Sequence, residues 1–138
     1  MTTPPRTDLS WLLEELVSGL PDAESAVLLS TDGLLMGRSA GLDQTEAERF
    51  AAMASAFHSL ARSAGSHFKA GGVCQTVVEL DRAVLFITAA GANACLALLA
   101  TESANMGMVA FEMNRTVQRV GSHLAVDSRP RPNGARQP

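Results

Sequence analysis

Residues 9–37 read LSWLLEELVSGLPDAESAVLLSTDGLLMG, which joins a helix pattern, a strand pattern and a tight turn in one stretch. Leucines recur at helical spacing after Asp8, the predicted N-cap, and a glycine and a proline near residue 20 predict the end of the helix. The apolar run at 25–30 predicts a strand. The TDG turn after it, where glycine permits a positive φ, predicts a hairpin with a second strand at 34–38.

Working outward, the rest of the chain alternates helical periodicity with short apolar runs. The expected elements are a long helix capped by Asp43 or Thr45, three strands, and a last helix capped by Ser103, over residues 45–66, 73–80, 83–90, 94–100 and 103–124. The links between neighbouring strands are mostly short, which favours an antiparallel sheet. Several strands are apolar at nearly every position, as in strands covered on both faces. The order αββαβββα therefore predicts an α+β sandwich with helices on both faces of the sheet.

Composition limits the class of protein. The chain has 138 residues, of which 46% are apolar and 18% charged, which is typical of a single globular domain. The net charge of −3 argues against a general nucleic-acid binder. The sequence has no apolar run long enough to span a membrane, and its first residues are polar without a signal core, so we expect a cytoplasmic protein. Cys74 and Cys95 lie in apolar runs, which predicts buried free thiols.

Three segments follow from these patterns. Residues 1–7 are expected to form a flexible N-terminal arm, residues 8–125 the folded domain, and residues 126–138 a disordered tail. The tail is rich in proline and arginine and has no apolar period, so it offers nothing for a core to bury.

The residues that carry catalysis elsewhere occur here without their usual context. The chain has one lysine, Lys69, and no phosphate-binding loop around it. His58, His67 and His123 do not have the spacing of metal ligands, and no serine has the sequence context of a nucleophile elbow. We therefore predict no catalytic, metal-binding or cofactor-binding residue, and a binding or regulatory module rather than an enzyme.

The long helix has two unlike rows of side chains. We expect its large apolar row to pack on the sheet; this row comprises Phe50, Met53, Ala54, Phe57, Leu60, Ala61 and Ala64. A second row of small residues predicts close contact with another helix, and it comprises Ala52, Ala56, Ser59 and Ser63. A plain solvent-facing side made of good helix formers is the open alternative for this second row.

The two terminal helices carry large apolar residues opposite their own apolar rows. Trp11 on the first helix, and Met108 and Phe111 on the last, are expected to face outward and mark a contact surface. Packing against a neighbouring helix or the N-terminal arm is the open alternative. Arg38, Arg115 and Arg119 are the arginines expected to reach outward.

These motifs resemble those of the Roadblock (dynein light chain) superfamily, specifically its bacterial members, over about residues 8–125. The resemblance rests on the opening stretch quoted above, on the alanine-rich helix FAAMASAFHSLARSAG, and on AVLFITAAGANACLALLA followed by a helix. It implies a five-stranded antiparallel sheet with the long helix on one face and the two terminal helices on the other, as in a profilin-like fold.

The resemblance also implies a function. It implies a homodimer in which the long helices meet and the third strands pair, so that Val73, Gln75 and Val77 join the small residues of the long helix at the interface. It implies a regulatory partnership with a small Ras-like GTPase in signalling, alongside a sensor-kinase-like protein. We place the partner surface on Trp11, Met108, Phe111 and Arg115. A scaffold for a kinase or cytoskeletal complex, or a small-ligand sensor, is the alternative function.

Overall fold

A computed structural model describes the backbone of residues 9–128 and the side chains of residues 9–123. It contains three helices and five strands in the predicted order αββαβββα. The elements are α1 (Ser10–Gly19), β1 (Ala23–Ser30), β2 (Leu35–Arg38), α2 (Gln44–His67), β3 (Thr76–Glu79), β4 (Ala83–Ala89), β5 (Ala94–Thr101) and α3 (Met106–Ser128). The predicted arm at 1–7 and residues 129–138 of the predicted tail lie outside the described residues.

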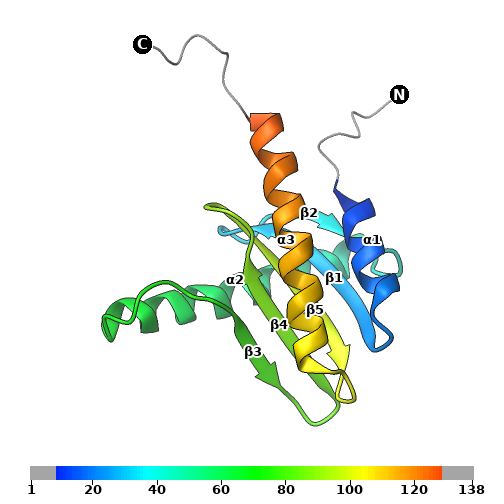
Figure 1. Cartoon of the computed structure of the whole chain (residues 1–138), viewed down its shortest axis with the longest axis horizontal. Helices are drawn as coiled ribbons and strands as arrows, with labels where there is room; N and C mark the ends of the chain where they lie inside the picture. Colours follow the sequence, from blue (N-terminus) through cyan, green and yellow to red (C-terminus); the bar gives the residue numbers. More distant parts are fainter. Residues whose placement is uncertain (1–8, 129–138) are drawn as a thin grey trace.

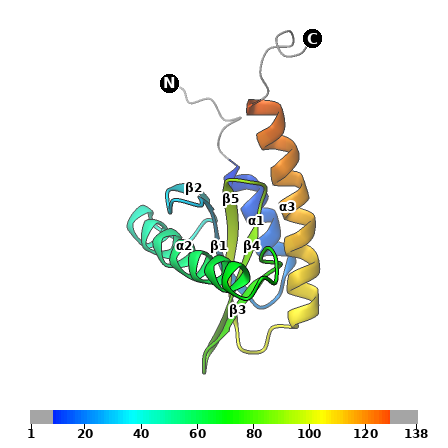
Figure 2. The ribbon, with the colours of Figure 1, turned by 90° about the vertical axis from the view of Figure 1, so that its left-hand side faces the viewer.

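The strands form one antiparallel sheet in the order β2-β1-β5-β4-β3. Figure 2 shows three layers, with α2 on one face of the sheet and α1 and α3 on the other. This confirms the predicted sandwich and the placement of its helices.

Each face of the sheet has its own core because strand side chains alternate between the two faces. On β1, Leu28 packs under α1 and α3, while Val27 and Leu29 pack under α2. The central strand β5 divides in the same way, with Leu96 and Leu98 on one side and Cys95 and Ala97 on the other. Burial on both faces explains why these strands are apolar at nearly every position.

The two edges of the sheet differ. At β2, side chains of α1 bond to the backbone: the Ser10 hydroxyl accepts from the Arg38 N–H at 3.1 Å, and the Glu14 carboxylate accepts from the Ala40 N–H. At the opposite edge, β3 has a neighbouring strand, β4, on one side only (Figure 1). An unpaired edge of this kind can pair with a strand of another chain.

Several predicted boundaries and caps are wrong. Strand β3 starts at Thr76, so Val73 and Gln75 precede it. Helix α3 starts at Met106, where the Asn105 Oδ1 accepts from the Met108 N–H, so Asn105 takes the capping role expected of Ser103.

Among the remaining predicted caps, helix ends and cysteine states, some are confirmed and some are wrong. The described cap position of α1 is Leu9, whose side chain makes no capping hydrogen bond, and the predicted cap Asp8 lies outside the described residues. Helix α3 continues to Ser128, beyond the expected end at 124. The Asp43 cap of α2 is confirmed, since its side chain accepts from the Glu46 N–H. Cys95 is buried and free as predicted, whereas Cys74 is free but exposed.

The face of α2 that packs on the sheet also differs from the prediction. Its buried residues are Ala47, Phe50, Ala51, Ala54 and His58. From the predicted apolar row, Met53 is 52% exposed and Leu60 69% exposed, and Phe57 is exposed as well. Phe50 and Ala54 of that row are buried as predicted, while small alanine side chains let the helix lie close to the sheet and leave Met53, Phe57 and Leu60 on its flank.

Candidate interaction surfaces

The first candidate site is an apolar surface beside the open edge of the sheet. We call it the α2–β3 surface, and it comprises Met53, Phe57 and Leu60 of α2, Val78 of β3, and Leu80. It contains a groove of about 370 Å³ between α2 and the part of the sheet that α2 leaves uncovered. The sheet side of this groove includes Leu85 and Leu99, and its polar lining residues are Ser25 and Glu46.

The residues predicted for a dimer contact do not all lie together. Ala52, Ala56, Ser59 and Ser63 are exposed along α2, so this row is accessible as expected. Val77 pairs with Phe86, whose side chain belongs to the core under α1 and α3. Paired residues share a face, so Val77 points to the side of the sheet opposite α2.

The other two residues of the predicted contact strand lie before β3. Gln75 donates through Nε2 to the Thr88 hydroxyl at 3.3 Å, and Val73 lies in the loop that leads to the strand. The predicted strand contact is therefore limited to the residues of β3 itself.

The second candidate site lies on the terminal helices, on the other side of the sheet. We call it the α1–α3 surface, and it comprises Trp11, Met108, Phe111, Arg115 and Arg119. The first four are exposed, as predicted, with Phe111 at 61%. Trp11 also contacts α3, because its ring meets the His123 ring edge-on at 5.5 Å and the Arg119 guanidinium lies over it at 5.5 Å. Trp11 therefore both faces outward and joins the two helices.

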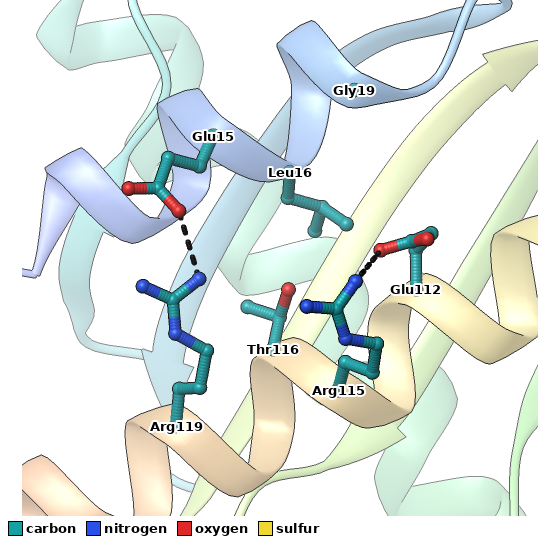
Figure 3. A pocket seen from close by; sticks show the side chains of 7 residues that line it. All are labelled: Glu15, Leu16, Gly19, Glu112, Arg115, Thr116 and Arg119. Atoms are coloured by element: carbon teal, nitrogen blue, oxygen red, sulfur yellow. Dashed lines mark hydrogen bonds and ion pairs between the residues drawn. The ribbon is translucent and has the colours of Figure 1, made fainter.

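A crevice of about 270 Å³ separates the two helices within this surface. Arg119 donates to the Glu15 carboxylate across the crevice at 2.8 Å, and Arg115 donates to Glu112 on its own helix at 3.1 Å. Figure 3 shows both guanidinium groups beside Thr116, with Glu112 beyond Arg115. The crevice is therefore lined by two ion pairs, unlike the apolar groove on the opposite face.

His58 is one of five buried polar residues in the described part of the chain, and the sequence analysis did not predict its burial. His58 lies on the side of α2 that faces the sheet and is 6% exposed, and its Nδ1 has no hydrogen-bond partner. Burial, and secondarily the charge of Arg62, lower the pKa of His58 below its usual 6.5. The sequence signal for this burial is the position of His58 four residues after Ala54 and seven after Ala51, which places it on the same face of the helix as these alanines.

Burial also affects the thiol of Cys95 and the hydroxyl of Thr76 on this side of the sheet. It raises the pKa of the Cys95 thiol, an effect that the charge of Arg62 partly opposes. The hydroxyl of Thr76, on β3, is buried without a hydrogen-bond partner. These groups belong to the packing under α2 rather than to an open site.

Among the side chains that the structure describes, those of residues 9–123, no group of three or more His, Cys, Asp or Glu residues is placed to hold a metal ion. The guanidinium of Arg38 donates to the Leu42 carbonyl at 2.6 Å, so this arginine is held against the loop before α2. Over the same part of the chain, no helix is both long enough and apolar enough to cross a membrane.

Comparison with known families confirms the resemblance. Residues 9–100 match the profile of the Roadblock/LC7 domain. This chain belongs to the Roadblock/LC7 family. A crystal structure of a Roadblock/LC7 domain from Streptomyces avermitilis is 46% identical, covers 85% of this chain and 98% of its own, and superposes with a TM-score of 0.82.

Two further solved structures extend the comparison. A second Roadblock/LC7 domain from Streptomyces avermitilis is 36% identical, with 80% and 96% of the two chains covered and a TM-score of 0.67. MglB from Myxococcus xanthus is 12% identical, covers 94% of this chain and 97% of its own, and has a TM-score of 0.81, which shows a shared fold. No protein of curated function matches this chain.

Proposed function

We propose that this Roadblock/LC7 protein is a non-catalytic homodimer that binds a small Ras-like GTPase and modulates its nucleotide cycle. The observation that carries the proposal is family membership combined with two separate exposed surfaces on opposite sides of one sheet. One surface suits self-association and the other suits a partner, so the two contacts need not compete.

The α2–β3 surface suits a second copy of this chain. Leu85 and Leu99 line the sheet side of its groove, Met53 and Phe57 line the α2 side, and Leu60 is exposed one turn after Phe57. Full burial of one such side chain stabilises an interface by about 1.5–3 kcal/mol. A two-fold axis places the flank of each α2 against the groove of the other copy, since such an interface uses one patch twice.

The β3 edge supports the same arrangement. Antiparallel pairing of β3 with its twin satisfies backbone groups that a lone edge exposes to solvent, and it makes one continuous sheet. The opposite edge does not compete, because Ser10 and Glu14 of α1 already bond to the backbone there. In this proposal the small residues Ala52, Ala56, Ser59 and Ser63 border the contact, and the large apolar flank supplies most of its area.

The α1–α3 surface suits the GTPase because its composition is that of a partner-binding surface. Tryptophan, methionine, phenylalanine and arginine are enriched at protein interfaces, and Trp11, Met108, Phe111 and Arg115 supply them here. The surface lies across the sheet from α2, so dimerisation leaves it accessible.

The proposed mechanism acts through the residues of the GTPase itself. We propose none of Arg38, Arg115 and Arg119 as an inserted arginine finger, since the resemblance to bacterial Roadblock proteins implies that the switch elements of the GTPase are repositioned instead. The protein instead favours one nucleotide state of its partner by binding that state more tightly.

Calorimetry tests the partnership. A Ras-like GTPase from the same organism, loaded in turn with GDP and with a non-hydrolysable GTP analogue, is titrated with the protein. We expect binding with unequal affinity in the two states. Absence of binding in both states overturns the GTPase proposal and favours the scaffold alternative, while equal affinity keeps the partner but excludes modulation, since equal affinity shifts no equilibrium.

A further inference from the structure

We propose that the crevice between α1 and α3 is a binding site for a carboxylate side chain of the partner protein. The inference rests on the proposed partnership and names the chemistry by which the α1–α3 surface recognises its partner. Arg115 and Arg119 are the binding residues, and Glu112 is an internal competitor.

The arrangement of charges carries the inference. Arg115 and Arg119 lie one turn apart on α3, and both line the crevice. Figure 3 shows the two guanidinium groups flanking Thr116, with the Glu112 carboxylate on the far side of Arg115. Arg119 is paired with Glu15 and Arg115 with Glu112, so the crevice is balanced in charge, and a partner carboxylate binds between the two arginines by taking the place of Glu112.

Both arginines have donors to spare. A guanidinium carries five N–H donors, and each of these two makes one ion pair through a single nitrogen. The side chain of Arg115 is 60% exposed and its Glu112 partner 32%, so water screens the pair. Exposed pairs of this kind contribute little to stability, so exchanging Glu112 for a carboxylate of the partner costs little.

The shape of the crevice admits a side chain. Gly19 ends α1 at its wall, and a Cβ built there meets no atom within 4 Å, so the space beside it is open. Leu16 and Thr116, both buried, also line the crevice. Trp11, stacked on Arg119, and Phe111, one turn before Arg115, stand nearby as apolar contacts. An aspartate or glutamate flanked by apolar side chains fits this pattern.

A small dicarboxylate tests the site without the GTPase. Glutarate is titrated into the protein while NMR follows the Nε–Hε resonances of the two arginines, against sodium chloride at matched ionic strength. We expect saturable shifts at both arginines. Glu112→Gln removes the competitor and should tighten glutarate binding about threefold, whereas Glu102→Gln, which changes the net charge equally at an exposed turn, should not.

Two results overturn the site. Shifts no larger than those in sodium chloride show that the arginines sense ionic strength alone. Weaker glutarate binding in Glu112→Gln shows that the glutamate supports an anion site rather than competing for it.

A blocked crevice tests the same site in the complex. Gly19→Met fills the open space without a Cβ clash, so the fold is retained. We expect this variant to lose glutarate binding and to bind the GTPase at least about tenfold more weakly. If the parent protein binds the GTPase and Gly19→Met binds it equally well, the crevice proposal fails while the proposed function stands. If glutarate binds and the GTPase does not, the partnership fails instead.

Discussion

The α2–β3 surface and the α1–α3 surface both expose large apolar side chains, but the residues around those side chains differ. On the first, Met53 and Phe57 line a groove whose lining holds a single charged residue, Glu46, and Leu60 is exposed one turn after Phe57. On the second, the apolar residues alternate with two ion pairs that line a polar crevice.

This contrast separates two kinds of association. Stable dimer interfaces resemble a core divided in two, whereas transient interfaces keep charged groups near apolar anchors. The α2–β3 surface therefore suits stable association with a second copy of this chain, and the α1–α3 surface suits a transiently bound partner. Of the four predictions below, in order of decreasing effect, two test this division and two test the packing on the α2 side of the sheet.

Leu60→Glu should abolish self-association, because it places a charge on the exposed apolar flank of α2 and repeats it at the two-fold contact. Ala56→Glu places the same charge on the row of small residues and should weaken the dimer less. Light scattering during size-exclusion chromatography measures both masses. A monomeric parent protein, or a greater loss in Ala56→Glu, reverses the assignment of the two rows.

Gly65→Ala should lower the free energy of unfolding by about 1–3 kcal/mol. A Cβ at Gly65 would overlap the Gly71 carbonyl oxygen in the loop that leads to β3. Gly121→Ala on α3 meets open space and should instead stabilise the protein by about 0.5–1 kcal/mol. Urea denaturation measures both variants, and equal midpoints would show that the loop moves aside freely.

Phe111→Ala should weaken GTPase binding about tenfold, since truncating a central interface residue typically costs more than 1 kcal/mol. Leu34→Ala is the matched control, because Leu34 is 67% exposed at the β1–β2 turn, outside both surfaces. Calorimetry compares the two variants with the parent protein. An unchanged affinity in Phe111→Ala would move the partner site away from α3 and toward the exposed row of α2.

His58 should make stability depend on pH on the α2 side of the sheet. Its pKa is lowered in the folded protein, so the unfolded chain binds protons more strongly. The free energy of unfolding therefore falls as the pH drops below about 6.5 and levels off below the folded pKa. The charged group that acts on His58 is Arg62 on α2, which also acts on Cys95 of β5.

The matched variants are His58→Leu and His123→Gln, with unfolding followed at pH 7.5 and pH 5.5. The loss of stability between these two values should shrink in His58→Leu. The same loss of stability should persist in His123→Gln, because the His123 ring lies on the α1–α3 side of the sheet. An equal pH dependence in the parent protein and in His58→Leu would contradict the assignment.

Local patterns in the chain were enough to predict the order of elements, the two-faced sheet and the family. The helical spacing of leucines in residues 9–37 is set by neighbours close in sequence. Strands that are apolar at nearly every position indicate burial of both faces, whatever covers them. Exposure of Trp11, Met108 and Phe111 followed in the same way, because each lies opposite a strong apolar row on its own helix.

The packing of α2 depends on dimensions that no local pattern contains. A helix of 24 residues is about 36 Å long, while five strands span about 19 Å, so α2 extends beyond the sheet that it covers. Where the sheet lies under it, the closely packing alanines and His58 turn inward, and Met53, Phe57 and Leu60 are left on the flank.

The meeting of Trp11 with His123 and of Arg119 with Glu15 likewise joins residues far apart in the chain. Helical periodicity identifies which side chains share one face of one helix. It does not determine where two helices cross, because that position depends on how both pack against the same sheet.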